Sequence, residues 1–253
     1  MLELSDCSAA YGPRPALSSV SLQVAAGHTA CIVGPSGCGK TTLLMIAAGL
    51  KSPSTGTVRV DGEPGRPGDR RVGLILQQYG LFPWFTVRQN VELGLRIRGT
   101  PASERHRIAV RELGLAGLEG CENLYPGQLS GGQQQRVGIA RAYALDPRLL
   151  LMDEPFSALD ALNREALQDL LLFSARGSRP AILLVTHSIE EAVYLGNEIW
   201  VLAGSPGRMV GRFENPGQGS REYRTENGFF KLCGEVRALM APNAPAAARE
   251  RAI

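Results

Sequence analysis

The chain has 253 residues, 44% of them hydrophobic, which is enough apolar material for the core of one large globular domain or two small ones. Its net charge is only +3, from 27 basic and 24 acidic residues, so the broad basic surface of a nucleic-acid-binding protein is not expected. No apolar run approaches the roughly 18 residues that cross a bilayer, and the first residues lack the pattern of a secretion signal. We therefore expect a cytoplasmic protein whose contact with a membrane runs through other proteins.

The first part of the chain predicts strands around a single helix. Residues 20–24 alternate apolar and polar side chains, and residues 29–34 form an apolar run that ends in glycine, so both are predicted strands. A glycine-rich turn follows, and residues 41–50 have the composition of a buried helix. Residues 53–62 favour a hairpin, and residues 72–78 favour another buried strand.

The second part changes period and then returns to alternation. Residues 87–145 have a helical pattern, which predicts an inserted helical subdomain. A strand at 149–155, a helix at about 161–175 and a strand at 181–187 follow. Such alternation is typical of an α/β protein with a largely parallel sheet.

One motif lies between the second predicted strand and the helix after it. Residues 34–41 read GPSGCGKT and fit the phosphate-loop pattern G-x-x-x-x-G-K-[ST] at every fixed position. Its backbone N–H groups and helix N-terminus favour phosphate, Lys40 is expected to reach the β- and γ-phosphates, and the Thr41 hydroxyl is expected to ligate Mg²⁺. Cys38 is predicted to be a small filler in the loop rather than a nucleophile. The predicted nucleotide-binding residues are Gly34, Pro35, Ser36, Gly37, Cys38, Gly39, Lys40, Thr41 and Thr42.

Hydrolysis additionally needs a carboxylate for the metal and a group that positions water. Asp153 and Glu154 end the apolar strand LLLM, and side chains alternate along a strand, so the two carboxylates can serve different purposes. Asp153 is the candidate ligand of Mg²⁺, and Glu154 is the candidate catalytic base.

The sequence LSGGQ at residues 129–133 lies between these two motifs and matches the signature sequence of the ABC ATPases, and with all three motifs the chain resembles that family over residues 2–213. The resemblance implies a P-loop NTPase core with a mostly parallel sheet, an antiparallel β subdomain and the inserted helical subdomain at about 87–145. It also implies that Tyr11 stacks on adenine. Gln77 would touch Mg²⁺ or the lytic water, and His187 would contact the γ-phosphate.

The same resemblance implies a second copy of the chain as partner. In the family, the signature residues meet the γ-phosphate of ATP on the other subunit of a head-to-tail homodimer. Carried over, this role falls on Ser130, Gly131, Gly132 and Gln133, which begin a predicted helix. Asp160, in the segment SALD, would couple the two ATP sites.

The loop after Gln77 points to a membrane partner. Its LFPW stretch (residues 81–84) presents apolar side chains where the family meets its permease, although packing within the helical subdomain explains them equally well. Together with residues 201–210, it resembles the importers of the nitrate, sulfonate and taurine group. The implied partners are transmembrane permease subunits and, indirectly, an external solute-binding protein, and the implied location is the cytoplasmic face of the inner membrane. Nitrate, an alkanesulfonate or taurine is the expected solute, with a pyrimidine-type solute also possible.

Other functions are less consistent with the sequence. A soluble ABC ATPase acting on ribosomes or DNA usually carries two ATPase domains or a long coiled coil, and an ATP-binding regulatory module does not need Glu154 and His187. An exporter ATPase stays an alternative. Residues 214–253 are predicted to be an extension with weak helical spacing and a frayed end, which either packs on the core or forms a small regulatory element.

Overall fold

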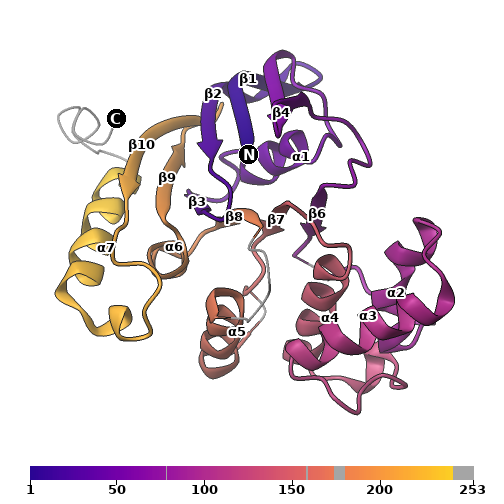
Figure 1. The fold of residues 1–253 in the computed structure, drawn as a ribbon. Helices are drawn as coiled ribbons and strands as arrows, with labels where there is room; N and C mark the ends of the chain where they lie inside the picture. The colour runs from indigo at the N-terminus through magenta and orange to yellow at the C-terminus, as the bar shows by residue number, and fades with distance from the viewer. Residues whose placement is uncertain (78, 158, 174–179, 242–253) are drawn as a thin grey trace.

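The computed structural model describes residues 1–77, 79–157, 159–173 and 180–241. Two β-sheets are stacked in it, and most helices lie on the far side of the larger sheet (Figure 1). Within these ranges, no helix combines the length and the apolar composition that crossing a bilayer requires. The α/β fold with a mostly parallel sheet is confirmed.

The smaller sheet is antiparallel, with strand order β2-β1-β4-β5. Strand β1 of this sheet was not predicted. Along it, buried residues alternate with partly exposed ones over most of its length, as in a strand with one face in the core. The sheet packs over α1 (Lys40–Ala47) and one face of the larger sheet, and this layer forms one of the hydrophobic clusters of the protein. The strands are β1 (Leu2–Tyr11), β2 (Arg14–Val24), β4 (Thr55–Val60) and β5 (Glu63–Pro64).

The larger sheet has strand order β10-β9-β3-β8-β7-β6. Neighbouring strands are parallel, except that β10 pairs with β9 in the antiparallel direction. Every residue of β3, β7 and β8 is buried, because helices or the other sheet cover both faces. The ends of these central strands carry the candidate site. The strands are β3 (Thr29–Val33), β6 (Val72–Ile75), β7 (Leu149–Asp153), β8 (Ala181–Thr186), β9 (Glu198–Ala203) and β10 (Arg208–Glu214).

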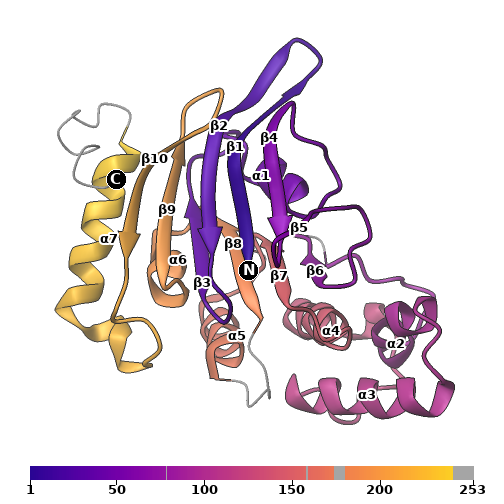
Figure 2. The same cartoon turned by 45° about the horizontal axis from the view of Figure 1, so that its top comes forward.

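Helices cover the other face of the larger sheet and form a separate group beside β6 (Figure 2). In that group, α2 (Val87–Ile97), α3 (Ala102–Leu115) and α4 (Gly131–Tyr143) enclose their own hydrophobic cluster. Below the sheet lie α5 (Ala161–Phe173) and α6 (Ile189–Leu195). One short 3₁₀ helix, Pro126–Gln128, precedes α4.

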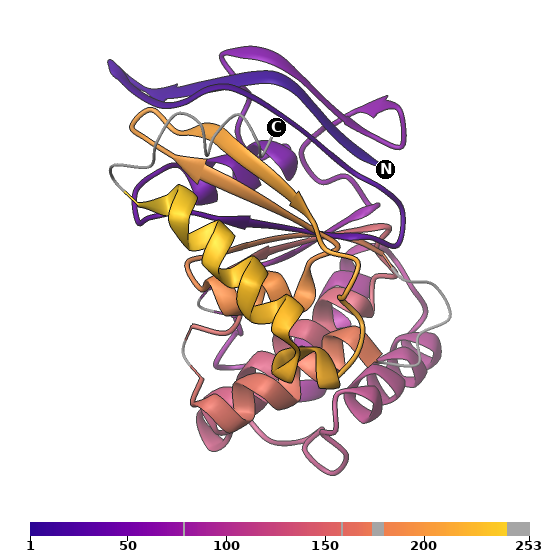
Figure 3. The same ribbon diagram turned by 90° about the vertical axis from the view of Figure 1, so that its left-hand side faces the viewer.

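The C-terminal segment packs against the core. A 3₁₀ helix (Glu222–Thr225) leads into α7 (Asn227–Met240), which lies along α6 and the β9–β10 edge (Figure 3). Buried Asn215 joins this segment to α6, because its side-chain amide donates to the carbonyls of Val193 and Gly196 while Tyr223 donates to its oxygen. The predicted frayed end falls on residues 242–253, outside the described residues.

Several element boundaries differ from the sequence prediction: β2 begins at Arg14 rather than at residue 20, and β7 ends at Asp153 rather than at residue 155. The helix predicted at 41–50 ends at Ala47, because Gly49 takes the left-handed conformation (φ 69°) that terminates helices. The strand predicted at 72–78 ends at Ile75, so Gln77 lies in the loop beyond β6 rather than at the strand end.

Candidate functional site

The glycines of the phosphate loop are required by its shape. The loop connects β3 to α1, and a Cβ at Gly34 would collide with the carbonyl oxygen of Leu202. Gly39 has φ 102°, and a Cβ there would lie 2.7 Å from a methyl carbon of Leu17. Only glycine accepts this backbone at such close approach, so the loop can curl and turn its N–H groups toward a bound phosphate.

Lys40 lies inside the curl. It is 6% exposed, and its ammonium donates to the carbonyls of Gly34 at 2.9 Å and Pro35 at 3.0 Å. A cation placed there complements phosphate oxygens bound by the loop. Cys38 is also buried, and burial raises the pKa of its thiol, so the sulfur stays protonated and packs as a filler.

Thr41 and Asp153 meet between α1 and the end of β7. The Thr41 hydroxyl donates to Oδ1 of Asp153 at 3.3 Å. Burial raises the pKa of Asp153, an effect that the Thr41 hydrogen bond partly offsets. A hydroxyl and a buried carboxylate beside a phosphate loop are hard oxygen donors of the kind that Mg²⁺ takes, so these residues fit a magnesium ion.

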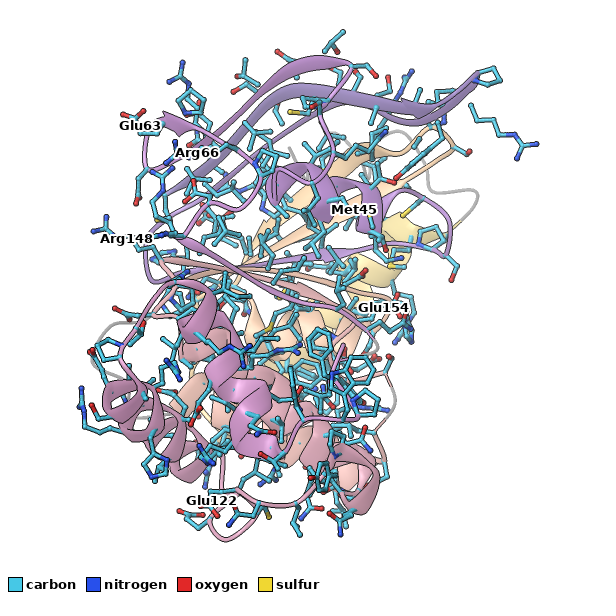
Figure 4. The ribbon with its side chains drawn as sticks, turned by 90° about the vertical axis from the view of Figure 1, so that its right-hand side faces the viewer. Met45, Glu63, Arg66, Glu122, Arg148 and Glu154 are labelled. Atoms are coloured by element: carbon cyan, nitrogen blue, oxygen red, sulfur yellow. The ribbon has the colours of Figure 1, made fainter. Side chains whose placement is uncertain are left out.

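The carboxylate of Glu154 contacts the side chains of two other predicted site residues. Oε2 of its carboxylate lies 3.1 Å from Nδ1 of His187 and 3.5 Å from Nε2 of Gln77. These side chains follow three neighbouring strands of the larger sheet, β7, β8 and β6. Figure 4 shows Glu154 at one edge of the molecule, between the sheets and the helical group.

The backbone at Glu154 is strained. Its φ is 44°, in the left-handed region that non-glycine residues rarely occupy, and its N–H donates to the carbonyl of Val185 at 2.9 Å. Strained residues of this kind persist where the surrounding structure imposes them, commonly at functional sites.

Tyr11 lies at the end of β1 and is half exposed. The ammonium of Lys51 lies 4.1 Å from the centre of its ring, and the hydroxyl of Thr42 lies 3.5 Å from its phenol oxygen. The ring is therefore placed beside the start of α1, where the phosphate loop ends.

The signature residues and Asp160 form a second group. Ser130 caps α4, since its hydroxyl accepts from the N–H of Gln133 while the Gln133 side chain accepts from the N–H of Ser130. A Cβ at Gly132, next to Gly131, would lie 3.6 Å from Asn163, whose side chain and N–H both donate to Asp160. Those hydrogen bonds hold the pKa of Asp160 below its usual range.

The phosphate loop and the signature lie on different sides of the larger sheet. The phosphate loop leads into α1, which lies between the sheets, whereas α4 and α5 lie on the opposite face of the larger sheet (Figure 1). Ser130 and Gly131 are exposed. The signature thus places the capped N-terminus of α4 at the surface of the described part of the chain.

Sequence reasoning missed residues that join these parts. Arg141 of α4 donates to the carbonyls of Tyr79 and Gly80 in the loop after Gln77, and so ties the helical group to that loop. Arg164 of α5 contacts Glu191 of α6. No local motif marks either arginine, because Tyr79, Gly80 and Glu191 are all distant from them in the sequence.

Comparison with known proteins agrees with this geometry. The family model described as ABC transporter matches residues 17–157. The taurine import ATP-binding protein TauB of Yersinia pestis is 49% identical over 212 residues, which cover 84% of this chain and 83% of that protein. TauB of Shigella boydii is 42% identical over 240 residues, covering 92% of this chain and 94% of the relative. A dimeric post-hydrolysis structure of the ATP-binding cassette MJ0796 with ADP and Pi has a TM-score of 0.74 at 34% identity, covering 85% of this chain and 98% of the other.

Proposed function

The chain belongs to the ABC transporter family, and from that premise we propose that it hydrolyses ATP to energise import of a small solute through a separate membrane permease. The observation that carries the proposal is that the side chains of Gln77 and His187 both contact the carboxylate of Glu154. This group lies one residue after Asp153, which faces the phosphate loop. We assign ATP binding and hydrolysis to residues 1–213 and regard residues 214–253 as an extension.

Residues around the loop bind the nucleotide. Tyr11 stacks on the adenine, the loop N–H groups and Lys40 bind the phosphates, and the oxygens of Thr41 and Asp153 hold Mg²⁺. The metal, when bound, neutralises phosphate charge and orients the phosphates for displacement. Support comes from the Thr41–Asp153 contact and from the similarity to a cassette whose structure contains ADP and Pi.

Three side chains act on the attacking water. Glu154 accepts a proton from it or orients it, and Gln77 helps to position it. His187, within hydrogen-bonding distance of Glu154, donates to the γ-phosphate and keeps the carboxylate oriented. The strained backbone of Glu154 supports this assignment, since it is costly without a function.

Two copies of the chain complete each site. The exposed start of α4, with Ser130 and Gly131, faces the γ-phosphate bound by the other copy, and Asp160 lies beside the signature to couple the two sites. The dimeric structures of a related cassette support a dimer of this chain, and the head-to-tail arrangement follows from the family resemblance.

The permease docks on the aromatic loop between β6 and α2. The rings of Phe82, Trp84 and Phe85 are mutually within 5.6 to 6.3 Å, and Trp84 is 67% exposed. An exposed indole on a preformed aromatic cluster is a typical anchor of a protein interface. This docking places the chain at the cytoplasmic face of the membrane.

The solute is taurine or a similar small sulfonate or anion, as the names of the TauB relatives suggest. It reaches the permease from an external solute-binding protein, so no residue of this chain needs to contact it. The relatives are transport proteins, which favours this function over that of a soluble ABC ATPase and import over export.

The test is ATP hydrolysis by the purified chain and by Glu154→Gln, with size-exclusion chromatography in ATP and Mg²⁺. We expect the variant to be inactive and to accumulate as an ATP-bound dimer, because binding survives and turnover does not. Glu63→Gln is the control, since Glu63 is exposed and lies at the opposite edge of the molecule in Figure 4. Hydrolysis by Glu154→Gln at the wild-type rate would contradict the catalytic assignment, and high turnover by a strictly monomeric sample would contradict the shared site.

A further inference from the structure

The loops that contain Asp160 and His187 follow two neighbouring parallel strands, β7 and β8. Each loop leads directly into a helix, α5 or α6. In the proposed function, the first loop faces the other copy of the chain and the second faces the γ-phosphate. A contact between these loops would therefore connect closure of the dimer to the catalytic residues.

Arg164 of α5 makes that contact. Its Nη2 donates to the carbonyl of Leu159, in the Asp160 loop, at 2.8 Å. Its Nε forms an ion pair with Oε1 of Glu191, on α6, at 3.5 Å. One guanidinium thus joins the Asp160 loop to the helix that begins just after His187.

Glu191 transmits the contact to the His187 loop. Glu191 is 6% exposed, and the second oxygen of its carboxylate accepts from the hydroxyl of Thr186 at 2.7 Å. That hydroxyl in turn accepts from the N–H of Ser188 at 3.0 Å. Thr186 and Ser188 are the two neighbours of His187, so the buried carboxylate sets the backbone on both sides of the histidine.

We propose that Arg164 and Glu191 are a positioning pair that couples the partner-facing Asp160 loop to the His187 loop, so that dimer closure aligns His187 with Glu154. The pair touches neither nucleotide nor water, and the proposal rests on the proposed function. When closure moves the Asp160 loop, the guanidinium carries the displacement to Glu191 and through Thr186 to the histidine.

A double-mutant cycle on the full-length chain tests the pair, using Glu191→Gln, Arg164→Gln and both together. Glutamine at 191 keeps an acceptor for Thr186 but removes the charge. We expect each single variant to lower kcat about tenfold and to leave ATP binding by the single chain unchanged, because the misaligned histidine affects turnover within the dimer. The double variant should be no slower than either single one, since both changes break the same link.

Measurements of thermal stability distinguish a positioning role of the Arg164–Glu191 pair from a role in stabilising the fold. Arg164→Gln leaves the Glu191 carboxylate buried without its cation and should lower Tm, whereas the double variant removes both charges and should recover Tm. Under the proposal kcat stays low in that double variant. Recovery of kcat together with Tm, multiplication of the two losses in the double variant, or normal kcat in the single variants would each overturn the proposal.

A second readout follows the dimer. In the Glu154→Gln background, Glu191→Gln should shift the ATP concentration for dimerisation severalfold upward, and an unchanged concentration would contradict coupling between the loops. The control is the Glu198–Arg212 ion pair, an Arg–Glu contact of 2.9 Å between β9 and β10, whose neutral variants should change neither readout.

If the wild type shows no Glu154-dependent hydrolysis, the proposed function fails and this proposal fails with it. If the wild type does show it, the double-mutant cycle tests the Arg164–Glu191 pair independently of the proposed function.

Discussion

Nδ1 of His187 lies 3.1 Å from Oε2 of Glu154, although 33 positions separate the two residues in the chain. The contact exists because β7 and β8 are parallel neighbours, so that both side chains leave the same edge of the sheet. The histidine is thereby placed to orient the carboxylate, and in the proposed function it also contacts the γ-phosphate.

Replacement of His187 by alanine should lower kcat about 100-fold and leave ATP binding nearly unchanged, since the loop and Lys40 remain. Steady-state hydrolysis and binding of a fluorescent ATP analogue measure the two effects. His106→Ala is a matched control, because Nδ1 of His106 also lies near a carboxylate, 4.0 Å from Glu92, but on the helical group. Equal losses in both histidine variants would point to a general effect on the fold.

Asp153→Asn should raise the Mg²⁺ concentration for half-maximal hydrolysis about tenfold, because an amide oxygen binds a hard cation more weakly than a carboxylate. A Mg²⁺ titration of hydrolysis and of nucleotide binding measures this change. An unchanged requirement for Mg²⁺ would exclude Asp153 as a metal ligand.

Trp84→Ala should abolish co-purification with the permease while basal hydrolysis by the isolated chain stays unchanged. The reason is that the indole is 67% exposed and anchors the interface rather than the site. Ile97→Ala is the control, since Ile97 is also exposed but ends α2. Retention of the complex by Trp84→Ala would favour packing within the helical group as the role of this loop.

Acid should destabilise the chain partly through Asp69. The carboxylate accepts three hydrogen bonds from the Arg71 guanidinium, which with the N–H of Arg71 hold the pKa of Asp69 below its usual value. A lowered folded-state pKa contributes stability that is present above the unfolded pKa, about 3.9, and is lost as pH falls through the folded value.

Chemical denaturation at several pH values tests this contribution. Asp69→Asn should lower the free energy of unfolding by about 2 kcal/mol at pH 7, and the difference from wild type should shrink below about pH 4. Glu214→Gln, at an exposed ion pair with Arg212, should cost less than about 0.5 kcal/mol at any pH. A difference for Asp69→Asn that stays constant into acid would show that its charge is not responsible.

Asn215→Ala should loosen the C-terminal segment. The change leaves the buried carbonyls of Val193 and Gly196 and the hydroxyl of Tyr223 without their partner, at a cost of about 3 kcal/mol. Hydrogen exchange should then rise in α6 and α7, whereas the exposed Asn227→Ala should have little effect. Unchanged exchange in α7 would mean that apolar packing alone secures the extension.

The sequence by itself determined the fold class and the local chemistry of the site. The loop of residues 34–41 and the pair Asp153–Glu154 are each contiguous, so their pattern and spacing predict phosphate and metal chemistry. The role proposed for residues 129–133 rests on the resemblance to the ABC ATPases. The tertiary structure decided which side chains contact one another. Gln77 and His187 reach Glu154, and Arg164 bridges Leu159 and Glu191, only through the order of β6, β7 and β8 and the packing of the helices behind them. Contacts between residues distant in the chain leave no local pattern, because strand pairing and helix packing, rather than spacing along the sequence, bring their side chains together.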